Sequence, residues 1–322
     1  MTHHAAWHTR QPGRFGVRIL FSTLTELILL IAGMPTVEAA SLSSNGAKVP
    51  RLEFQYANTV KNKSWVLANI IGEKDGRGSL LELGPKLGMS KEEIQQARAS
   101  TGYVYCESST KPAGTEHAVS GFLALSNQVV VTAGHAFWGT RIPTKLKCFF
   151  QNQRARYQRE ELDFSPGAYY VGSAGMVSQD YAVIRLKHPI RGAVPYQIAS
   201  MSGDPTHNDV GAAIIAVISH QNIAADKDHA VPLVEGCNIR QENLTDIYTD
   251  CDMAQFGSGS VNLIRQNGRL VAKAMTVASG SSKRDYFPYN PALGSVTRAM
   301  LISDSFLKAV VSLAHEGTFF VE

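Results

Sequence analysis

Three short motifs carry a histidine, an aspartate and a serine, the residue types used for nucleophilic attack on a carbonyl group. His135 ends the run VVVTAGH, Asp180 begins the run DYAVIRL, and Ser258 lies within FGSGSVNL. A serine hydroxyl is a weak nucleophile at neutral pH and needs a neighbouring base. A histidine can accept its proton, and a carboxylate can hold the histidine in the required tautomer. Taken singly, the motifs also fit a surface or core histidine, a turn-forming aspartate and a flexible Gly-Ser turn.

The elements that must position these residues are predicted to be short strands. From Gly102 onward, β-branched and aromatic runs recur between Gly, Asn, Asp and Pro, a spacing typical of β barrels or sandwiches. A capping box, Ser90 followed by Glu93, predicts a short helix to about Arg98. Helical periodicity returns at 304–316. The expected strands are 103–106, 121–125, 128–133, 147–150, 169–172, 181–186, 212–219, 247–251, 260–264 and 269–277.

The three motifs in the order His, Asp, Ser resemble those of the chymotrypsin-like (trypsin-like) serine proteases, over roughly residues 102–312. Thr132-Ala133-Gly134-His135 and the segment from Asp180 to Leu186 match well, and Ser258-Gly259-Ser260 matches in part. The absence of a Cys after His135 makes the chain similar to the bacterial branch, which includes glutamyl endopeptidase-like enzymes. The resemblance implies an all-β fold: two six-stranded antiparallel β-barrels with a C-terminal helix. The protease domain would span 102–322, with the first barrel at about 102–190 and the second at about 191–322.

The resemblance also implies a role for each residue. His135 would be the general base and acid, Asp180 would orient it, and Ser258 would be the nucleophile. The oxyanion hole would use the backbone N–H groups of Ser258 and Phe256. Phe256 replaces the family's glycine, and the loss of one such donor costs about 3–4 kcal/mol of transition-state stabilisation. Two functions therefore stay open: a serine endopeptidase, and an inactive homologue that acts as a protein-binding module.

The family's primary specificity pocket is predicted from four residues. Asp252, six residues before Ser258, would lie at its base and attract Lys or Arg side chains; alternatively, it is a hydrogen-bonded residue at a strand end. The wall would be Ala278, Ser279 and Gly280. Val277 stands where glutamyl-specific relatives place a histidine, which argues against an acidic preference. A third interpretation of the whole chain is an unrelated β protein with chance motifs.

The N-terminus predicts export. Arginines precede the apolar run at 19–34, and small residues follow it, as in a signal peptide (1–40) cleaved near Ala39 or Ala40. Residues 41–101 would be an N-terminal arm or pro-segment, and the mature protein would be secreted or periplasmic, with no stable membrane span. Export permits two disulfides. Neighbourhood in the sequence favours Cys106–Cys148 and Cys237–Cys251 among the three possible pairings.

The remaining composition limits the partners. The net charge of +4 is small for 322 residues, and no clustered basic face argues for nucleic acid. No Cys-x-x-Cys spacing occurs, so we expect no metal site, and no cofactor is implied. The expected partners are protein or peptide substrates, and the sequence leaves the oligomeric state open.

Overall fold

The computed structural model describes the chain from residue 71 to residue 315 with gaps. The described residues are 71, 75–107, 115–138, 147–152, 158–173, 177–199, 209–219, 232–253, 257–280, 290 and 296–315. All of them belong to one compact unit, Leu52–Glu322. The predicted signal peptide and Phe256 lie outside the described residues.

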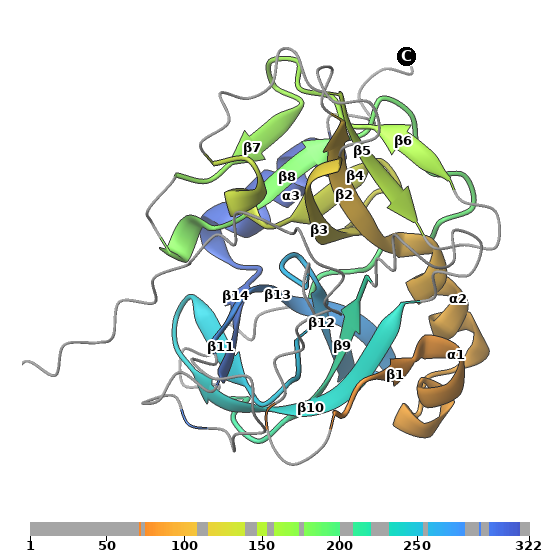
Figure 1. The fold of residues 1–322 in the computed structure, drawn as a ribbon, viewed down its shortest axis with the longest axis vertical. Helices are drawn as coiled ribbons and strands as arrows, with labels where there is room; N and C mark the ends of the chain where they lie inside the picture. Colours follow the sequence, from red (N-terminus) through yellow and green to blue (C-terminus); the bar gives the residue numbers. More distant parts are fainter. Residues whose placement is uncertain are drawn as a thin grey trace, which may run out of the picture. The chain divides into compact units, whose positions relative to one another are not determined.

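The first barrel is a curled antiparallel sheet of seven strands (Figure 1). In β5 (Lys147–Asn152), alternate residues are buried: Cys148, Phe150 and Asn152. This alternation is the two-residue period that one buried face of a sheet requires. The strands, in the spatial order β6-β5-β2-β3-β4-β8-β7, are β2 (Thr101–Glu107), β3 (Thr115–Leu123), β4 (Val129–Thr132), β5 (Lys147–Asn152), β6 (Arg159–Glu161), β7 (Tyr169–Val171) and β8 (Ala182–Arg185).

The second barrel is a closed antiparallel ring, because β10 pairs with β9 as well as with β11. A seventh strand, β1 (Gly78–Ser79), adds to it along β10. Closure removes the free edges that would otherwise expose unpaired backbone groups. The ring consists of β9 (Ala213–Ile218), β10 (Leu233–Glu242), β11 (Asp246–Thr249), β14 (Val296–Leu301), β13 (Arg269–Gly280) and β12 (Val261–Gln266).

The predicted all-β double barrel with a C-terminal helix is confirmed, and one strand count is wrong. The closed ring has six strands as expected, whereas the first barrel has seven. The sheet ends on each side in a strand of three residues, β6 and β7. All ten predicted strands are present, and the described residues form four others that were missed: β1, β6, β10 and β14.

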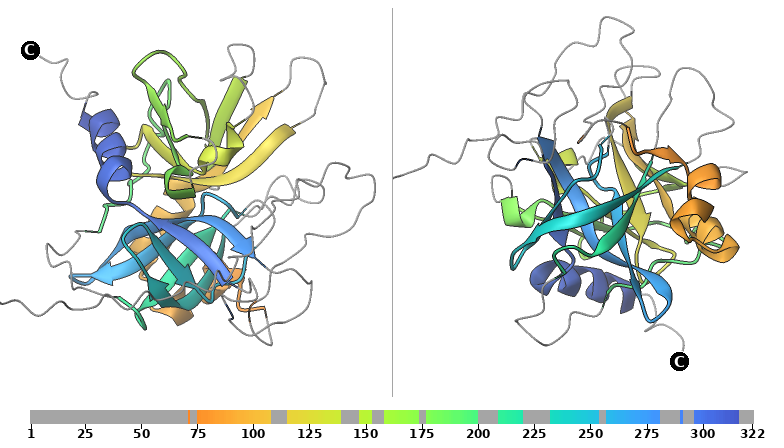
Figure 2. Two further views of the ribbon diagram at one scale, coloured as in Figure 1. Left: turned by 90° about the vertical axis from the view of Figure 1, so that its left-hand side faces the viewer. Right: turned by 90° about the horizontal axis from the view of Figure 1, so that it is seen from below.

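Helices flank the barrels rather than enter them (Figures 1 and 2). α1 (Leu80–Leu83), the 3₁₀ turn Pro85–Leu87 and α2 (Lys91–Ser100) precede the first barrel. The predicted capping box of α2 is confirmed: Ser90 Oγ accepts from the backbone N–H of Glu93, and the Glu93 carboxylate accepts from that of Ser90. α3 (Asp304–His315) follows the last strand of the second barrel but packs on β4 and β8 of the first.

Both predicted disulfides are confirmed. Cys106 of β2 pairs with Cys148 of β5, and Cys237 of β10 pairs with Cys251 just beyond β11. Each bond therefore lies within one barrel. In the part of the chain that the structure describes, no helix has both the length and the apolar character to cross a membrane.

Candidate active site

His135 is delivered by a fully buried strand and a tight turn. The side chains of β4 are all buried, and the 3₁₀ turn Gly134–Ala136 follows it directly. Gly134 packs against the chain beside Asp180: a Cβ on Gly134 would lie 2.8 Å from the carbonyl oxygen and 2.9 Å from the nitrogen of Tyr181. Only glycine allows this approach, which brings the His135 turn against the Asp180 segment.

The structure brings His135 and Asp180 into direct contact. His135 Nδ1 lies 2.9 Å from Asp180 Oδ2 and 3.1 Å from Oδ1, and the backbone N–H of His135 donates to Oδ1 at 2.8 Å. The side chains are 22% and 9% exposed, respectively. Because the carboxylate engages Nδ1, the ring presents Nε2 to any other partner. This is the arrangement that a general-base histidine requires.

The Asp180 segment is held from two sides. The backbone N–H of Gly172 donates to Tyr181 O (2.9 Å), and Trp138 Nε1 donates to Gly172 O (2.9 Å). On the other side, the Tyr181 ring stacks on Phe306 of α3 with a centroid distance of 4.4 Å. The C-terminal helix thus supports the segment that carries the aspartate.

Ser258 stands at the corner of a tight turn. The N–H of Ser260 donates to Gly257 O at 3.0 Å, and Gly259 has a φ of 89°. These features fit a type II turn, in which the third residue needs a positive φ and is therefore glycine. A Cβ on Gly259 would also lie 1.9 Å from Ser120 O. The turn is therefore pressed directly against β3 of the first barrel.

Backbone hydrogen bonds join this turn to the strands beside His135. The N–H of Ser120 in β3 donates to Ser258 O at 2.8 Å, and Thr132 Oγ1 donates to Ser120 O at 2.7 Å. Thr132 is the last residue of β4, three residues before His135. Ser120 Oγ in turn accepts from the N–H of Ser219, the residue after β9 of the second barrel, at 3.2 Å. The Ser258 turn is thus fixed at the end of the strand that delivers His135.

The Ser258 hydroxyl itself makes a different contact. Among the described residues, Ser258 Oγ donates to Val277 O at 3.4 Å, and no hydrogen bond joins it to His135. Hydrogen bonds between a nucleophile and its base are often long or unformed without substrate. The structure therefore brings His135 and Asp180 together and leaves Ser258 close to the same strands, without the Ser–His hydrogen bond.

The predicted pocket residues lie along two segments of the second barrel. Asp252 is 1% exposed, and both oxygens of its carboxylate accept backbone hydrogen bonds, from the N–H groups of Ile71 and Gly76 at 2.6 Å each. Such bonds are expected of a hydrogen-bonded residue at a strand end, the second role considered for Asp252. Ala278 is buried in β13, one residue beyond the Val277 carbonyl that Ser258 contacts; Ser279 and Gly280 complete that strand.

Sequence reasoning missed the residues that support this site. Ser120 and Glu235 are buried polar residues, 0% and 5% exposed, inside strands. A serine in the apolar run AVSGFLAL and a glutamate in LVEGC are the only signals that the sequence offers for them. Burial, and after it the negative charge of Asp252, raises the pKa of Glu235 to about 9. Among the described residues, no group of three His, Cys, Asp or Glu side chains is placed to hold a metal ion.

Comparisons with known proteins agree with this architecture. No profile of a known protein family matches the chain, and no curated protein sequence matches it. Among solved structures, a Glu endopeptidase in complex with MPD superposes with a TM-score of 0.51 at 14% identity, covering 75% of this chain and 98% of that one. At this identity the likeness concerns the fold, which is that of the chymotrypsin-like proteases.

Two further structures were found at lower similarity. The protease Anisep from Arthrobacter nicotinovorans gives a TM-score of 0.47 at 12% identity, covering 67% of this chain and 95% of that one. The MamO protease domain from Magnetospirillum magneticum gives a TM-score of 0.40 at 12% identity, covering 63% of this chain and 93% of that one.

Proposed function

We propose that this chain is a serine endopeptidase in which His135, Asp180 and Ser258 form the catalytic triad. The observation that carries the proposal is the contact of the Asp180 carboxylate with His135 Nδ1, at 2.9 Å. It lies just beyond β4, whose last residue, Thr132, is linked to the Ser258 turn through Ser120. The chymotrypsin-like fold supports it as an analogy, since a fold alone does not specify an activity.

The proposed reaction is hydrolysis of a peptide bond through an acyl-enzyme. Ser258 Oγ attacks the carbonyl carbon while His135 Nε2 takes the hydroxyl proton. The tetrahedral intermediate collapses, the C–N bond breaks, and His135 passes the proton to the leaving amine. A water molecule then attacks the acyl-serine by the same route and releases the acid. Asp180 stays ionised and stabilises the imidazolium that forms twice in this cycle.

The oxyanion donors are proposed to be the backbone N–H groups of Ser258 and Phe256. The family's glycine at the second position lets the backbone turn its N–H toward the intermediate, and a phenylalanine resists such conformations. The rate of the proposed enzyme therefore depends on whether substrate binding turns the Phe256 N–H toward the oxygen of the tetrahedral intermediate.

The test is active-site labelling of the full chain with a fluorophosphonate probe. We expect one labelled site, found at Ser258 by peptide mass spectrometry, and loss of the label in Ser258→Ala. The matched control is Ser260→Ala, because Ser260 lies in the same turn and has no proposed role. A correctly folded wild type that takes no label contradicts the proposal.

A second candidate function is binding of a protein partner by an inactive homologue. Two observations favour it: the sequence has Phe256 where the family's motif has its oxyanion glycine, and Ser258 Oγ donates to Val277 O rather than to His135. Affinity of the Ser258→Ala variant for an immobilised protein, with no labelling of the wild type, would support this function over catalysis.

We further propose that the chain is exported and acts on proteins or peptides outside the cytoplasm. The two disulfides support an oxidising compartment. Mass spectrometry of the N-terminus of the mature protein tests the proposed cleavage near Ala39 or Ala40; an intact Met1 would contradict it.

A further inference from the structure

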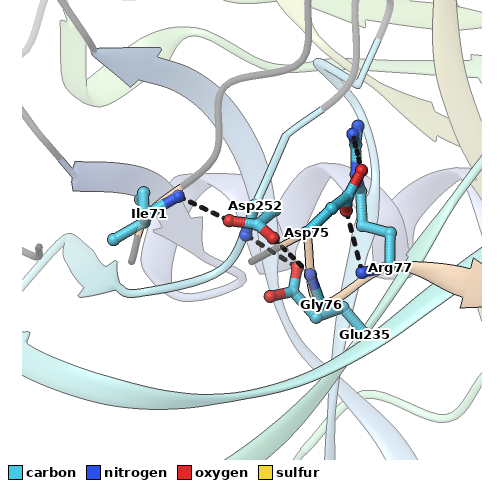
Figure 3. A network of polar contacts seen from close by, with 6 residues as sticks. All are labelled: Ile71, Asp75, Gly76, Arg77, Glu235 and Asp252. Atoms are coloured by element: carbon cyan, nitrogen blue, oxygen red, sulfur yellow. Dashed lines mark hydrogen bonds and ion pairs between the residues drawn. The ribbon is translucent and has the colours of Figure 1, made fainter. Parts of the chain in front are cut away.

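A short strap, residues 71 and 75–79, lies along the second barrel and is held by one carboxylate. The backbone N–H of Ile71 donates to Asp252 Oδ1 and that of Gly76 donates to Asp252 Oδ2, each at 2.6 Å (Figure 3). The strap then continues into β1, which pairs with β10. A single side chain therefore fixes the strap at two points five residues apart.

The main chain of Asp252 is anchored independently of its carboxylate. Its N–H donates to Glu235 Oε2 of β10 at 2.7 Å. The preceding residue, Cys251, is tied to β10 by its disulfide with Cys237 and to β14 by Thr297 Oγ1, which donates to Cys251 O at 2.7 Å. Asp252 thus connects a rigid part of the ring to the strap.

The charges around Asp252 explain why its carboxylate needs the strap. Four charged or titratable side chains lie in this network: Asp75, Arg77, Glu235 and Asp252 (Figure 3). Arg77 donates two hydrogen bonds to the Asp75 carboxylate, with Nε–Oδ1 and Nη2–Oδ2 distances of 2.8 and 2.7 Å. A buried carboxylate without partners is strongly unfavourable, and the partners that the described residues offer Asp252 are the two N–H groups of the strap.

Asp252 also begins the segment that leads to the proposed nucleophile, six residues before Ser258. The far end of that segment is fixed by the bond from the Ser120 N–H to Ser258 O. We propose that Asp252 is a positioning residue. Its two hydrogen bonds to the strap, called the clasp below, hold the start of this segment in place and so keep the Ser258 hydroxyl within reach of His135. This inference rests on the proposed endopeptidase function.

The proposal differs from a specificity role in what it predicts. Both Asp252 oxygens are satisfied by donors of the same chain, so no substrate cation is needed to compensate them. Loss of the clasp should therefore reduce the rate of attack by Ser258 and leave substrate affinity unchanged.

The test compares the full-length wild type with Asp252→Asn, which keeps the side-chain size but turns an amide donor toward a strap N–H. The matched control is Asp250→Asn. Asp250 also accepts a backbone N–H, from Asn238 at 2.7 Å, and pairs with Arg240, but among the described residues it makes no hydrogen bond to the strap. Two quantities are measured: amide hydrogen exchange of the peptide containing the strap, and fluorophosphonate labelling of Ser258 as a function of probe concentration.

We expect Asp252→Asn to raise exchange in the strap about tenfold, the factor that a hydrogen bond to a charged group contributes to local opening. The maximal labelling rate should fall about 10- to 100-fold, as small misplacements of reacting groups do, with the half-saturating probe concentration unchanged. Asp250→Asn should alter neither quantity. If Asp252→Asn does not fold, Ile71→Pro removes one strap donor and Ile71→Val is its control.

Three results would overturn the proposal. If amide hydrogen exchange of the strap rises in Asp252→Asn without a change in the labelling rate, the clasp is purely structural. If the exchange is unchanged, the carboxylate does not hold the strap. A folded wild type that takes no label would refute the proposed function and the positioning role together, and the exchange data would still report separately on the strap.

Discussion

Substitution of Glu235 by glutamine should change how the stability of the protein depends on pH. Glu235 is 5% exposed and accepts a hydrogen bond from the N–H of Asp252 at 2.7 Å. Burial, and then the charge of Asp252, raises its pKa from 4.5 to about 9. The folded protein therefore holds this proton at neutral pH, whereas the unfolded chain releases it above about pH 4.5.

The sign and size of the effect follow from this difference in proton binding. Between about pH 4.5 and 9 the folded state binds one proton more than the unfolded state at Glu235, so the free energy of unfolding falls by about 1.4 kcal/mol for each pH unit. Glutamine mimics the protonated carboxyl and carries no titration. From pH 5.5 to 8.5 the wild type should therefore lose about 4 kcal/mol relative to Glu235→Gln.

Urea unfolding of both proteins at four pH values across this window measures the difference. Glu93→Gln is a suitable control, because the pKa of Glu93, opposed by burial but bonded to Arg265, is lowered. Glu93 is then ionised above pH 5.5 in both the folded and the unfolded state. The free energy of unfolding of Glu93→Gln should therefore differ from that of the wild type by a constant amount. A constant difference for Glu235→Gln as well would mean that Glu235 is ionised in the folded protein, and the reasoning would fail.

Three further predictions concern the proposed triad. Asp180→Asn should slow labelling of Ser258 about 10⁴-fold at unchanged stability, because the amide favours the wrong tautomer of His135; an unchanged rate would contradict the triad. Gly134→Ala should lower the free energy of unfolding by about 1–3 kcal/mol in urea titrations, because its Cβ would meet backbone atoms of Tyr181 at 2.8–3.1 Å; unchanged stability would contradict this close approach. Phe256→Gly should raise peptidase turnover by up to about 10²–10³-fold, and no rise would show that Phe256 does not limit the oxyanion hole.

The strands that were predicted from sequence are those whose local pattern is strong. β4 and β8 are β-branched runs bounded by turn residues, and both were found within two residues of their bounds. β10 was missed because Glu235, Gly236 and Arg240 break its apolar alternation, and a bulge near Ile239 disturbs its register. Its stability comes from pairing with strands on both sides, a tertiary effect that propensity does not capture.

The site was predictable to the same extent. Short motifs identified His135 and Asp180, because the turn chemistry that places them is local in sequence. The contacts that hold Ser258 and Asp252 are not local: they come from Ser120 in the first barrel and from Ile71 and Gly76 in the strap. No motif marks these partners, since each of the three holds Ser258 or Asp252 through a backbone N–H.

The two departures from the family pattern affect different parts of the proposed mechanism. The position of Ser258 depends on Ser120 and on the bond from the Gly259 N–H to Thr276 O (2.7 Å), neither of which involves the side chain at position 256. In the proposed mechanism, Phe256 bears on the oxyanion donor. Since Asp252 acts on placement, its substitution and that of Phe256 should change the labelling rate independently, and their effects should multiply in the double variant.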